Sequence, residues 1–216
     1  LLALLLSIII KLFFDKIQNI IELTEQTNLP VIGGLSSSEE VGNIMNINIR
    51  SKGHFVESLR SIRTSLNFLL DNSKSEENFK SFLITSIHPG EGKTFTSINL
   101  ARILASSGKS VLVVDFDLHK PKIHKVLELS NDKGTSKVLV DNLDFESSII
   151  NIEENLNVLA SGPIPPNPSE LVLSKNVDKL IEYASSNFNY LIIDTPPIGY
   201  ITDALVLSKK VNHSLF

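Results

Sequence analysis

The segment from His88 to Thr94 has the residue types and the spacing needed to hold a chain of phosphates. Gly90 and Gly92 allow a turn tight enough for main-chain N–H groups to point at a phosphate. Lys93 can reach the β- and γ-phosphates of a nucleoside triphosphate, and the hydroxyl of Thr94 can bind Mg²⁺. We therefore predict an ATP- and Mg²⁺-binding loop, whose nucleotide contacts come from Pro89, Gly90, Glu91, Gly92, Lys93, Thr94 and Phe95.

This loop departs at one position from the usual pattern G-x-x-x-x-G-K-[ST], because the chain has Ile87 where the pattern begins with glycine. An ordinary turn with an accidental Gly-Lys-Thr is the alternative interpretation. The apolar run 82–87 predicts a buried strand before the loop, and 94–107 predicts a helix after it that Gly108 ends. A strand before the loop and a helix after it are the context that the motif requires.

Carboxylates follow two other predicted strands. Asp115 and Asp117 end the run that begins at Val111, and Asp194 ends the run 190–193. The carboxyl ends of parallel strands form the ligand-binding edge of an open α/β sheet, and residues two apart in a strand point the same way. One carboxylate could accept a proton from an attacking hydroxyl while another supports the metal.

We therefore expect Lys93, Asp115 and Asp117 to be catalytic, and Thr94, Asp117 and Asp194 to bind the metal. The alternative stays open that these aspartates only cap turns or helix ends.

The elements that must position these residues alternate along the chain. Strands are expected at 82–87, 111–114, 156–160 and 190–193, and helices at 55–70, 94–107, 123–129, 136–140, 168–174 and 177–185. This alternation predicts an α/β fold, a doubly wound, mainly parallel sheet with helices on both faces.

Composition narrows the function. The chain has 216 residues, of which 42% are hydrophobic, so one sizeable core is expected. The formal net charge of −4 gives no broad positive field, which argues against nucleic acid as the main partner. The absence of cysteine excludes disulfides, cysteine-ligated zinc and thiol catalysis.

The ends of the sequence predict an incomplete chain. Residues 1–14 are apolar apart from Ser7 and Lys11, and we interpret them as the inner end of a membrane helix. Residues 15–54 are expected to be a juxtamembrane segment and linker, with a short strand and turn at 29–35, and 55–216 to be the P-loop domain. A helix end at 205–211 and a strand opening at 213–216 suggest that the sheet continues beyond Phe216.

The motifs resemble one family. Gly90-Glu-Gly-Lys-Thr94, Val114-Asp-Phe-Asp-Leu-His-Lys-Pro121 and Ile193-Asp-Thr-Pro-Pro197 look like the Walker A, A′ and B motifs of bacterial tyrosine kinases, the cytoplasmic domains of polysaccharide co-polymerases in the MinD/ParA-like class. Residues 162–171 resemble a further family segment. His88, where MinD-type ATPases usually have lysine, favours the kinase branch, whereas His119 departs from the arginine common in the family.

The resemblance implies autophosphorylation on tyrosine and control of capsular or exopolysaccharide chain length and export at the bacterial inner membrane. It also implies a homo-oligomeric ring formed through the helix at 55–70, which carries Glu57, Arg60 and Arg63 at the spacing E-x-x-R-x-x-R. Glu57 and Arg60 could instead form a simple intrahelical pair. The expected partners are the polysaccharide polymerisation and export machinery and a tyrosine phosphatase.

The acceptor tyrosines are not visible in the sequence. The family usually presents a C-terminal tyrosine cluster, whereas this chain has only Tyr183, Tyr190 and Tyr200, which form no cluster. A MinD/ParA-like ATPase switch, or a nucleotide-bound oligomeric scaffold without catalysis, therefore remain the alternatives.

Overall fold

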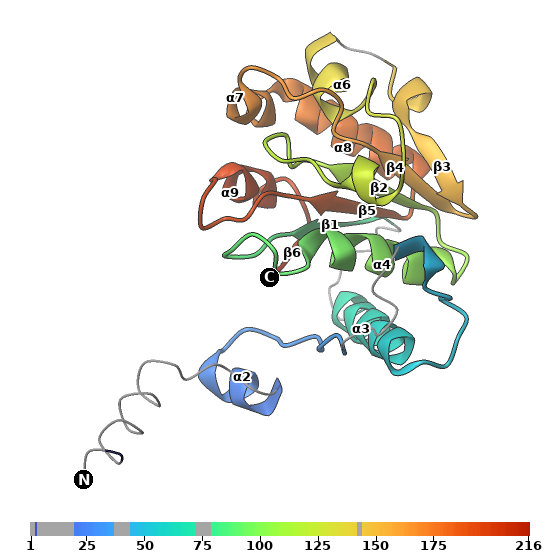
Figure 1. Cartoon of the computed structure of the whole chain (residues 1–216), viewed down its shortest axis with the longest axis vertical. Helices are drawn as coiled ribbons and strands as arrows, with labels where there is room; N and C mark the ends of the chain where they lie inside the picture. The colour runs from blue at the N-terminus through green and yellow to red at the C-terminus, as the bar shows by residue number, and fades with distance from the viewer. Residues whose placement is uncertain (1–2, 4–19, 37–43, 72–78, 142–143) are drawn as a thin grey trace.

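A six-stranded sheet forms the centre of the computed structural model, which describes residues 3, 20–36, 44–71, 79–141 and 144–216 (Figure 1). The strand order is β3-β4-β2-β5-β1-β6. The bounds are β1 (Lys80–Ile84), β2 (Val111–Asp115), β3 (Ile150–Glu153), β4 (Leu156–Leu159), β5 (Tyr190–Asp194) and β6 (His213–Leu215). All strand pairs are parallel except β3–β4, which is antiparallel.

Helices cover both faces of this sheet. They are α3 (His54–Asp71), α4 (Lys93–Ala105), α5 (Ile123–Val126), α6 (Thr135–Asp141), α7 (Pro168–Val172), α8 (Lys175–Asn187) and α9 (Asp203–Ser208), with 3₁₀ helices at Ile44–Asn46 and Glu146–Ser148. A further helix, α2 (Ile20–Gln26), lies beyond α3, away from the sheet (Figure 1). The predicted doubly wound, mainly parallel fold is confirmed.

The central strands are apolar on both sides because they separate two hydrophobic cores. In β5, Ile192 packs into one core with residues of α3 and α4, whereas its neighbours Leu191 and Ile193 pack into the other with residues of α6 to α9. Every residue of β2 and β5 is buried. Such continuous apolar runs are typical of parallel strands covered by helices on both faces.

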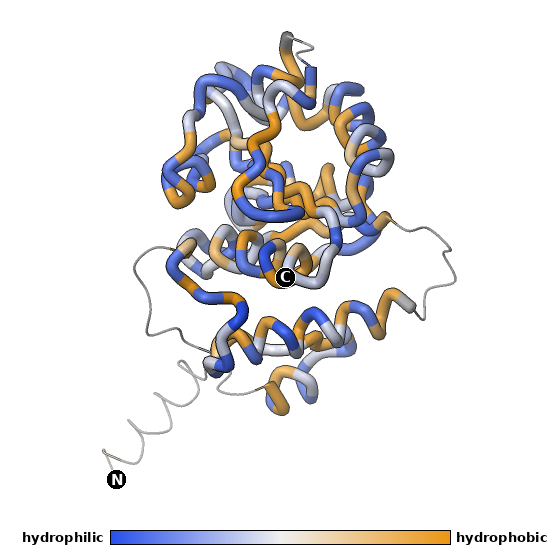
Figure 2. The backbone as a smooth tube through the Cα atoms, turned by 90° about the vertical axis from the view of Figure 1, so that its right-hand side faces the viewer, coloured by the Kyte–Doolittle hydropathy of each residue, from blue (hydrophilic) through white to orange (hydrophobic). Residues whose placement is uncertain are grey.

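Helix α3 forms an outer layer against α4. Hydrophobic and hydrophilic residues alternate along it (Figure 2), and its buried residues Phe55, Leu59, Ile62 and Leu66 lie on the core side. This is the helical spacing expected from the sequence.

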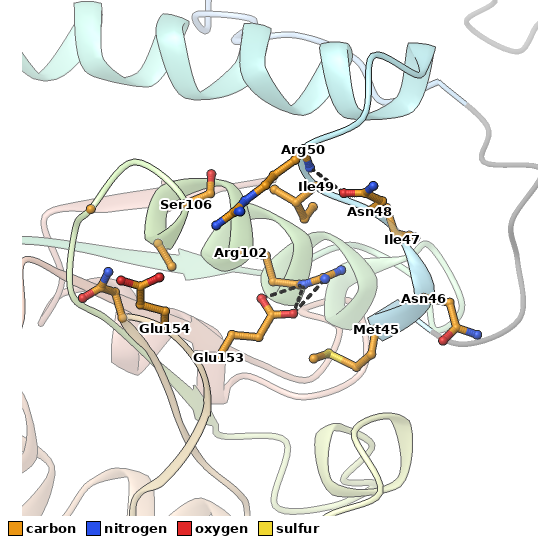
Figure 3. Close-up of a pocket in the computed structure, with 13 residues that line it drawn as sticks. Met45, Asn46, Ile47, Asn48, Ile49, Arg50, Arg102, Ser106, Glu153 and Glu154 are labelled. Atoms are coloured by element: carbon orange, nitrogen blue, oxygen red, sulfur yellow. Dashed lines mark hydrogen bonds and ion pairs between the residues drawn. The ribbon is translucent and has the colours of Figure 1, made fainter.

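Residues 44–50, which were expected to lie within a linker, are packed against α3 and α4. Ile44, Ile47 and Ile49 are buried. The guanidinium of Arg102 donates from Nη1 to the carbonyl oxygen of Ile44 at 2.8 Å, and from Nε and Nη2 to the carboxylate of Glu153 (Figure 3). Residues 45–50, residues near the end of α4 and residues 153–155 line a cavity of about 570 Å³. This cavity lies at the edge of the sheet opposite the phosphate loop.

The structure corrects two other expectations. Residues 29–35 form no strand; instead Gly33 lies so close to α3 that a Cβ there would approach Ile62 Cγ1 to 2.9 Å. The antiparallel edge strand β3 was not predicted. The strand expected to open at 213 is present as β6.

The expected membrane helix at 1–14 lies outside the described residues, apart from Ala3. Among the residues that the structure describes, no helix has the length and apolar character needed to cross a membrane. The division into membrane, linker and P-loop segments stays a prediction.

Candidate active site

The phosphate loop joins β1 to α4 at the carboxyl edge of the sheet. Gly90 and Gly92 have φ angles of 89° and 88°, in the left-handed region that favours glycine. A Cβ at either position would meet no atom within 4 Å, so the backbone conformation, not crowding, requires glycine. Gly92 is also the N-cap of α4, whose first N–H groups have no partner within the helix. This geometry makes an anion site at the start of the helix.

Lys93 lies over this loop. Its Nζ donates to Ser86 Oγ at 2.9 Å, and the Ser86 hydroxyl donates to the carbonyl oxygen of His88 at 2.9 Å. The ammonium group is thereby held near the loop entrance. The sequence interpretation missed Ser86, because a serine at the end of an apolar run carries no signal of its own.

Asp194 is a buried carboxylate, 2% exposed, at the end of β5. Thr94 Oγ1 donates to its Oδ2 at 2.6 Å, and Ser97 Oγ donates to its Oδ1 at 2.9 Å. Burial raises the pKa of Asp194 to about 6, and the two hydroxyl hydrogen bonds, together with the positive charge of Lys93, oppose that rise. A buried carboxylate of this kind is a candidate functional group because a cation would stabilise its charged form.

These contacts bring three of the predicted residues together: Lys93, Thr94 and Asp194. Ser97 was missed, although it follows Thr94 by three residues and therefore lies on the same face of α4. Mg²⁺ in nucleotide sites takes one or two protein oxygens, with phosphates and waters completing the shell. The hydroxyl of Thr94 and the carboxylate of Asp194 are oxygens of this type. The described residues contain no cluster of three acidic or histidine side chains that could hold a metal unaided.

Asp115 and Asp117 differ from each other in burial. Asp115 pairs with Asp194 in the β2–β5 register, is fully buried, and accepts the N–H groups of Asp117 at 3.1 Å and Ile123 at 3.3 Å. Burial, followed by the nearby charge of Asp194, raises the pKa of Asp115 well above its usual value. Asp117 is partly exposed and accepts the N–H of Lys120 at 2.9 Å.

Both aspartates therefore cap the loop after β2, which is the alternative considered from the sequence. Asp117 also influences Asp194, because its charge raises the pKa of that carboxyl. Asp117 is thus electrostatically coupled to the site and reachable from solvent, whereas Asp115 is enclosed.

The segment after β5 is joined to the phosphate loop. The Thr195 hydroxyl donates to the carbonyl oxygen of Ile84 at 2.8 Å. The N–H of Ile198 donates to the carbonyl oxygen of Ser86 at 2.8 Å. A Cβ on Gly199 would lie 2.6 Å from the carbonyl oxygen of Ile87. Ile87, which stands where the motif pattern has glycine, is 47% exposed.

Other loop residues lie at the rim. Glu91 accepts the N–H of His88 at 2.9 Å, and this hydrogen bond lowers the pKa of Glu91. The ring of Tyr200, which is 67% exposed, meets the ring of His88 edge-on at 6.1 Å. The sequence interpretation gave Tyr200 no place near the loop. Pro89 is exposed and Phe95 is half-buried, with its ring tilted against that of Phe55 in α3 at a centroid distance of 5.3 Å.

The charged residues of α3 lie apart from this site. Arg60 Nη1 contacts Glu57 Oε1 at 2.5 Å, and Nη2 donates to the carbonyl oxygen of Ile49 at 3.0 Å. Arg63 Nη1 donates to the carbonyl oxygen of Ile103 in α4 at 3.3 Å. Both arginines therefore make contacts within their own chain, and their use between subunits stays a prediction.

Comparisons with known proteins agree on one family. A family profile described as AAA domain matches residues 79–211. The tyrosine-protein kinase YwqD of Bacillus subtilis is 41% identical over 160 residues, which is 74% of this chain and 66% of YwqD. The putative tyrosine-protein kinase CapB of Staphylococcus aureus is 36% identical over 165 residues, 76% of this chain and 71% of CapB.

A solved structure extends the match. The crystal structure of the chimerical protein CapA2B2 superposes with a TM-score of 0.79 at 36% identity, covering 90% of this chain and 82% of that one. Together with the P-loop between β1 and α4 and the acidic ends of β2 and β5, these matches show that the chain belongs to the family of bacterial tyrosine-protein kinases, within the nucleotide-binding P-loop class.

Proposed function

We propose that this chain is an ATP-dependent protein-tyrosine autokinase. The observation that carries the proposal is the cluster formed by Lys93, Thr94 and Asp194 beside the glycine loop, in a member of the tyrosine-protein kinase family. Phosphoryl transfer needs little covalent chemistry from a protein, so positioning and charge stabilisation account for most of the catalysis. The cluster supplies both.

The nucleotide contacts follow from the loop. The main-chain amides from Gly90 to Thr94 bind the phosphates, and Lys93, which donates to Ser86 in this structure, neutralises charge on the transferring phosphoryl group. Thr94 and Asp194, with Asp117 beside them, would hold Mg²⁺, and the ion would supply further neutralisation of the phosphate charge.

Asp117 positions or deprotonates the tyrosine hydroxyl, because it is the partly exposed member of the acidic pair. Asp115 acts through the backbone: by accepting the N–H groups of Asp117 and Ile123, it fixes the loop that carries Asp117. We assign Asp115 a positioning role on this ground.

Assembly and cellular role belong to the same proposal. The family resemblance supports attachment to the bacterial inner membrane, control of polysaccharide chain length and export, and regulation by a tyrosine phosphatase. It also supports a ring formed through Glu57, Arg60 and Arg63. Glu57 and Arg60 lie at the surface, with side chains 54% and 29% exposed, and an exposed pair of this kind costs little to separate.

The test uses the full-length chain and ATP labelled at the γ-phosphate. Lys93→Met should abolish phosphotyrosine formation, whereas Lys109→Met, at an exposed position before β2, should not. Equal labelling of the Lys93→Met variant and the wild type would overturn the assignment. Phosphate release without any phosphotyrosine would instead identify an ATPase switch.

A further inference from the structure

The loop that caps β2 continues into a cavity of about 470 Å³ beside the candidate active site. Its lining includes three lysines, Lys120, Lys122 and Lys125, together with His119 and His124. The lining begins at His119, two residues after Asp117, so the cavity adjoins the place where we expect the acceptor hydroxyl. No function assigned above uses these lysines.

The cavity is a local excess of positive charge on an acidic chain. The formal net charge of the protein is −4, yet no aspartate or glutamate lines this cavity. The three lysines are exposed, and within the described parts of the chain their ammonium groups make no hydrogen bond or ion pair. The nearby acid Asp203 is occupied, because its Oδ2 lies 3.1 Å from His119 Nε2. The lysine charges are therefore available to a ligand.

The walls of the cavity are fixed before any ligand binds. On one side the N–H of Lys120 is held by Asp117, and the N–H of Ile123 by Asp115. On the other side the Asn131 side chain donates to the carbonyl oxygen of Gly162 at 2.8 Å and accepts its N–H at 2.9 Å. A fixed frame of this kind lowers the conformational cost of binding.

One rim residue is apolar. Ile164 is 62% exposed and belongs to the proline-rich segment 162–171, for which the proposed mechanism has no role. A rim of lysines beside an exposed aliphatic side chain suits an extended peptide that carries both carboxylates and apolar groups. The phosphates of ATP have their own main-chain amides in the loop before α4, so the nucleotide does not need this cavity.

We propose that the cavity binds the acidic residues that flank the acceptor tyrosine of a substrate peptide, with Lys122 and Lys125 as specificity-determining residues. The inference rests on the proposed kinase function, because it names the substrate class of that site. Opposite charges at an exposed rim steer association and select partners more than they add raw affinity.

Binding can be measured apart from catalysis. The probe is a fluorescein-labelled peptide in which phenylalanine, replacing the acceptor tyrosine, is flanked by glutamates; a second probe has glutamines instead. In fluorescence anisotropy, the full-length chain should bind the glutamate probe more tightly. Lys122→Gln/Lys125→Gln should weaken that binding about tenfold, as expected for the loss of two exposed ion pairs.

The matched control removes the same charge elsewhere. Lys109→Gln/Lys179→Gln alters two exposed lysines, before β2 and in α8, and should leave the preference for the glutamate probe intact. Lys122→Arg/Lys125→Arg keeps both positive charges and should also retain the preference for the glutamate probe. This variant shows whether a loss in the glutamine variant comes from the charge or from misfolding of the loop. Equal binding of the two probes by the wild type, or equal loss in the control pair, would overturn the proposal.

A second arm separates the two proposals. With tyrosine restored, the wild type should phosphorylate the glutamate peptide with the higher kcat/KM. Phosphorylation of both peptides with equal kcat/KM would refute the proposal that the cavity selects acidic residues, and would leave the proposed kinase activity standing. Tight, lysine-dependent binding of the glutamate probe without any phosphorylation would support binding of acidic residues in the cavity and refute the proposed kinase activity.

Discussion

The carboxyl edge of the sheet and the charged face of α3 both looked functional in the sequence, but the structure gives them different chemistry. At the sheet edge, Asp194 is 2% exposed and held by two hydroxyls. On α3, the Glu57–Arg60 pair is partly exposed, and Arg60 and Arg63 donate to carbonyl oxygens of their own chain.

The difference shows what a pattern of charges can establish. A buried carboxylate with a raised pKa is costly for the fold unless a cation joins it, so its presence indicates a ligand site. Exposed charges that pair locally cost little and are compatible with a plain surface or an interface. The sheet edge should therefore respond strongly to substitution in nucleotide chemistry, and α3 mainly in assembly.

After the complete loss expected for Lys93→Met, the largest effect is expected for Asp194→Asn. Loss of the charge that holds Mg²⁺ should lower phosphotyrosine formation by about 10²–10³-fold, the range for removing one preorganised electrostatic group. The control is Asp178→Asn in α8, where the carboxylate makes an exposed pair with Lys210. Phosphotyrosine formation in the two variants is measured with ATP labelled at the γ-phosphate. Similar activity in both variants would contradict the claim that the sheet edge is the site of nucleotide chemistry.

The next effect is a pH dependence of stability in the ligand-free protein. With its pKa raised from 3.8 to about 6, Asp194 binds more protons folded than unfolded between these values. Stability should therefore fall as the pH rises through this window, by about 3 kcal/mol from this group alone. Urea unfolding at several pH values should show a shallower fall for Asp194→Asn, whereas identical profiles would contradict the burial argument.

A smaller effect tests the loop backbone. Gly92→Ala and Gly108→Ala change two glycines with φ of 88° and 81°, and neither new Cβ would meet an atom within 4 Å. Each substitution should cost about 1–2 kcal/mol of stability because both backbones are left-handed. Calorimetric titration with ADP should show roughly tenfold weaker binding only for Gly92→Ala. Equal affinities in the two variants would mean that the loop does not hold phosphate.

The smallest effects on stability are expected on α3. Arg63→Gln removes the contact with Ile103 and should cost about 1 kcal/mol, whereas Glu57→Gln should cost no more than about 0.5 kcal/mol. Both variants of the full-length chain should shift toward smaller species in sedimentation velocity. Unchanged assembly in both would leave α3 with an intramolecular role alone.

The central fold could be predicted because its signals are local. Continuous apolar runs at β2 and β5, each ending in aspartate, can hardly be anything but buried strands at a ligand edge. The edge strand β3 escaped prediction because its residues are only partly buried and mix polar with apolar types. Residues 29–35 read as a strand from their apolar character, yet they pack on α3 without a strand partner.

The loop glycines, Lys93, Thr94 and the three aspartates could be proposed as site residues from their types, their spacing and their place at the ends of apolar runs. Ser86 and Ser97 could not, because their role depends on side-chain contacts with Lys93 and Asp194 that form only when β1, α4 and β5 meet. The lysine-lined cavity also depends on segments distant in sequence, since Asn131 and Ile164 complete its walls.

The most direct measurement is an electron paramagnetic resonance titration with Mn²⁺, used in place of Mg²⁺, in the presence of ADP. The wild type should bind one ion per chain together with the nucleotide, and Thr94→Ala and Asp194→Asn should each weaken that binding strongly, because both oxygens hold the same ion. Undiminished Mn²⁺ binding in both variants would contradict the claim that the glycine loop and the end of β5 form one nucleotide–metal site.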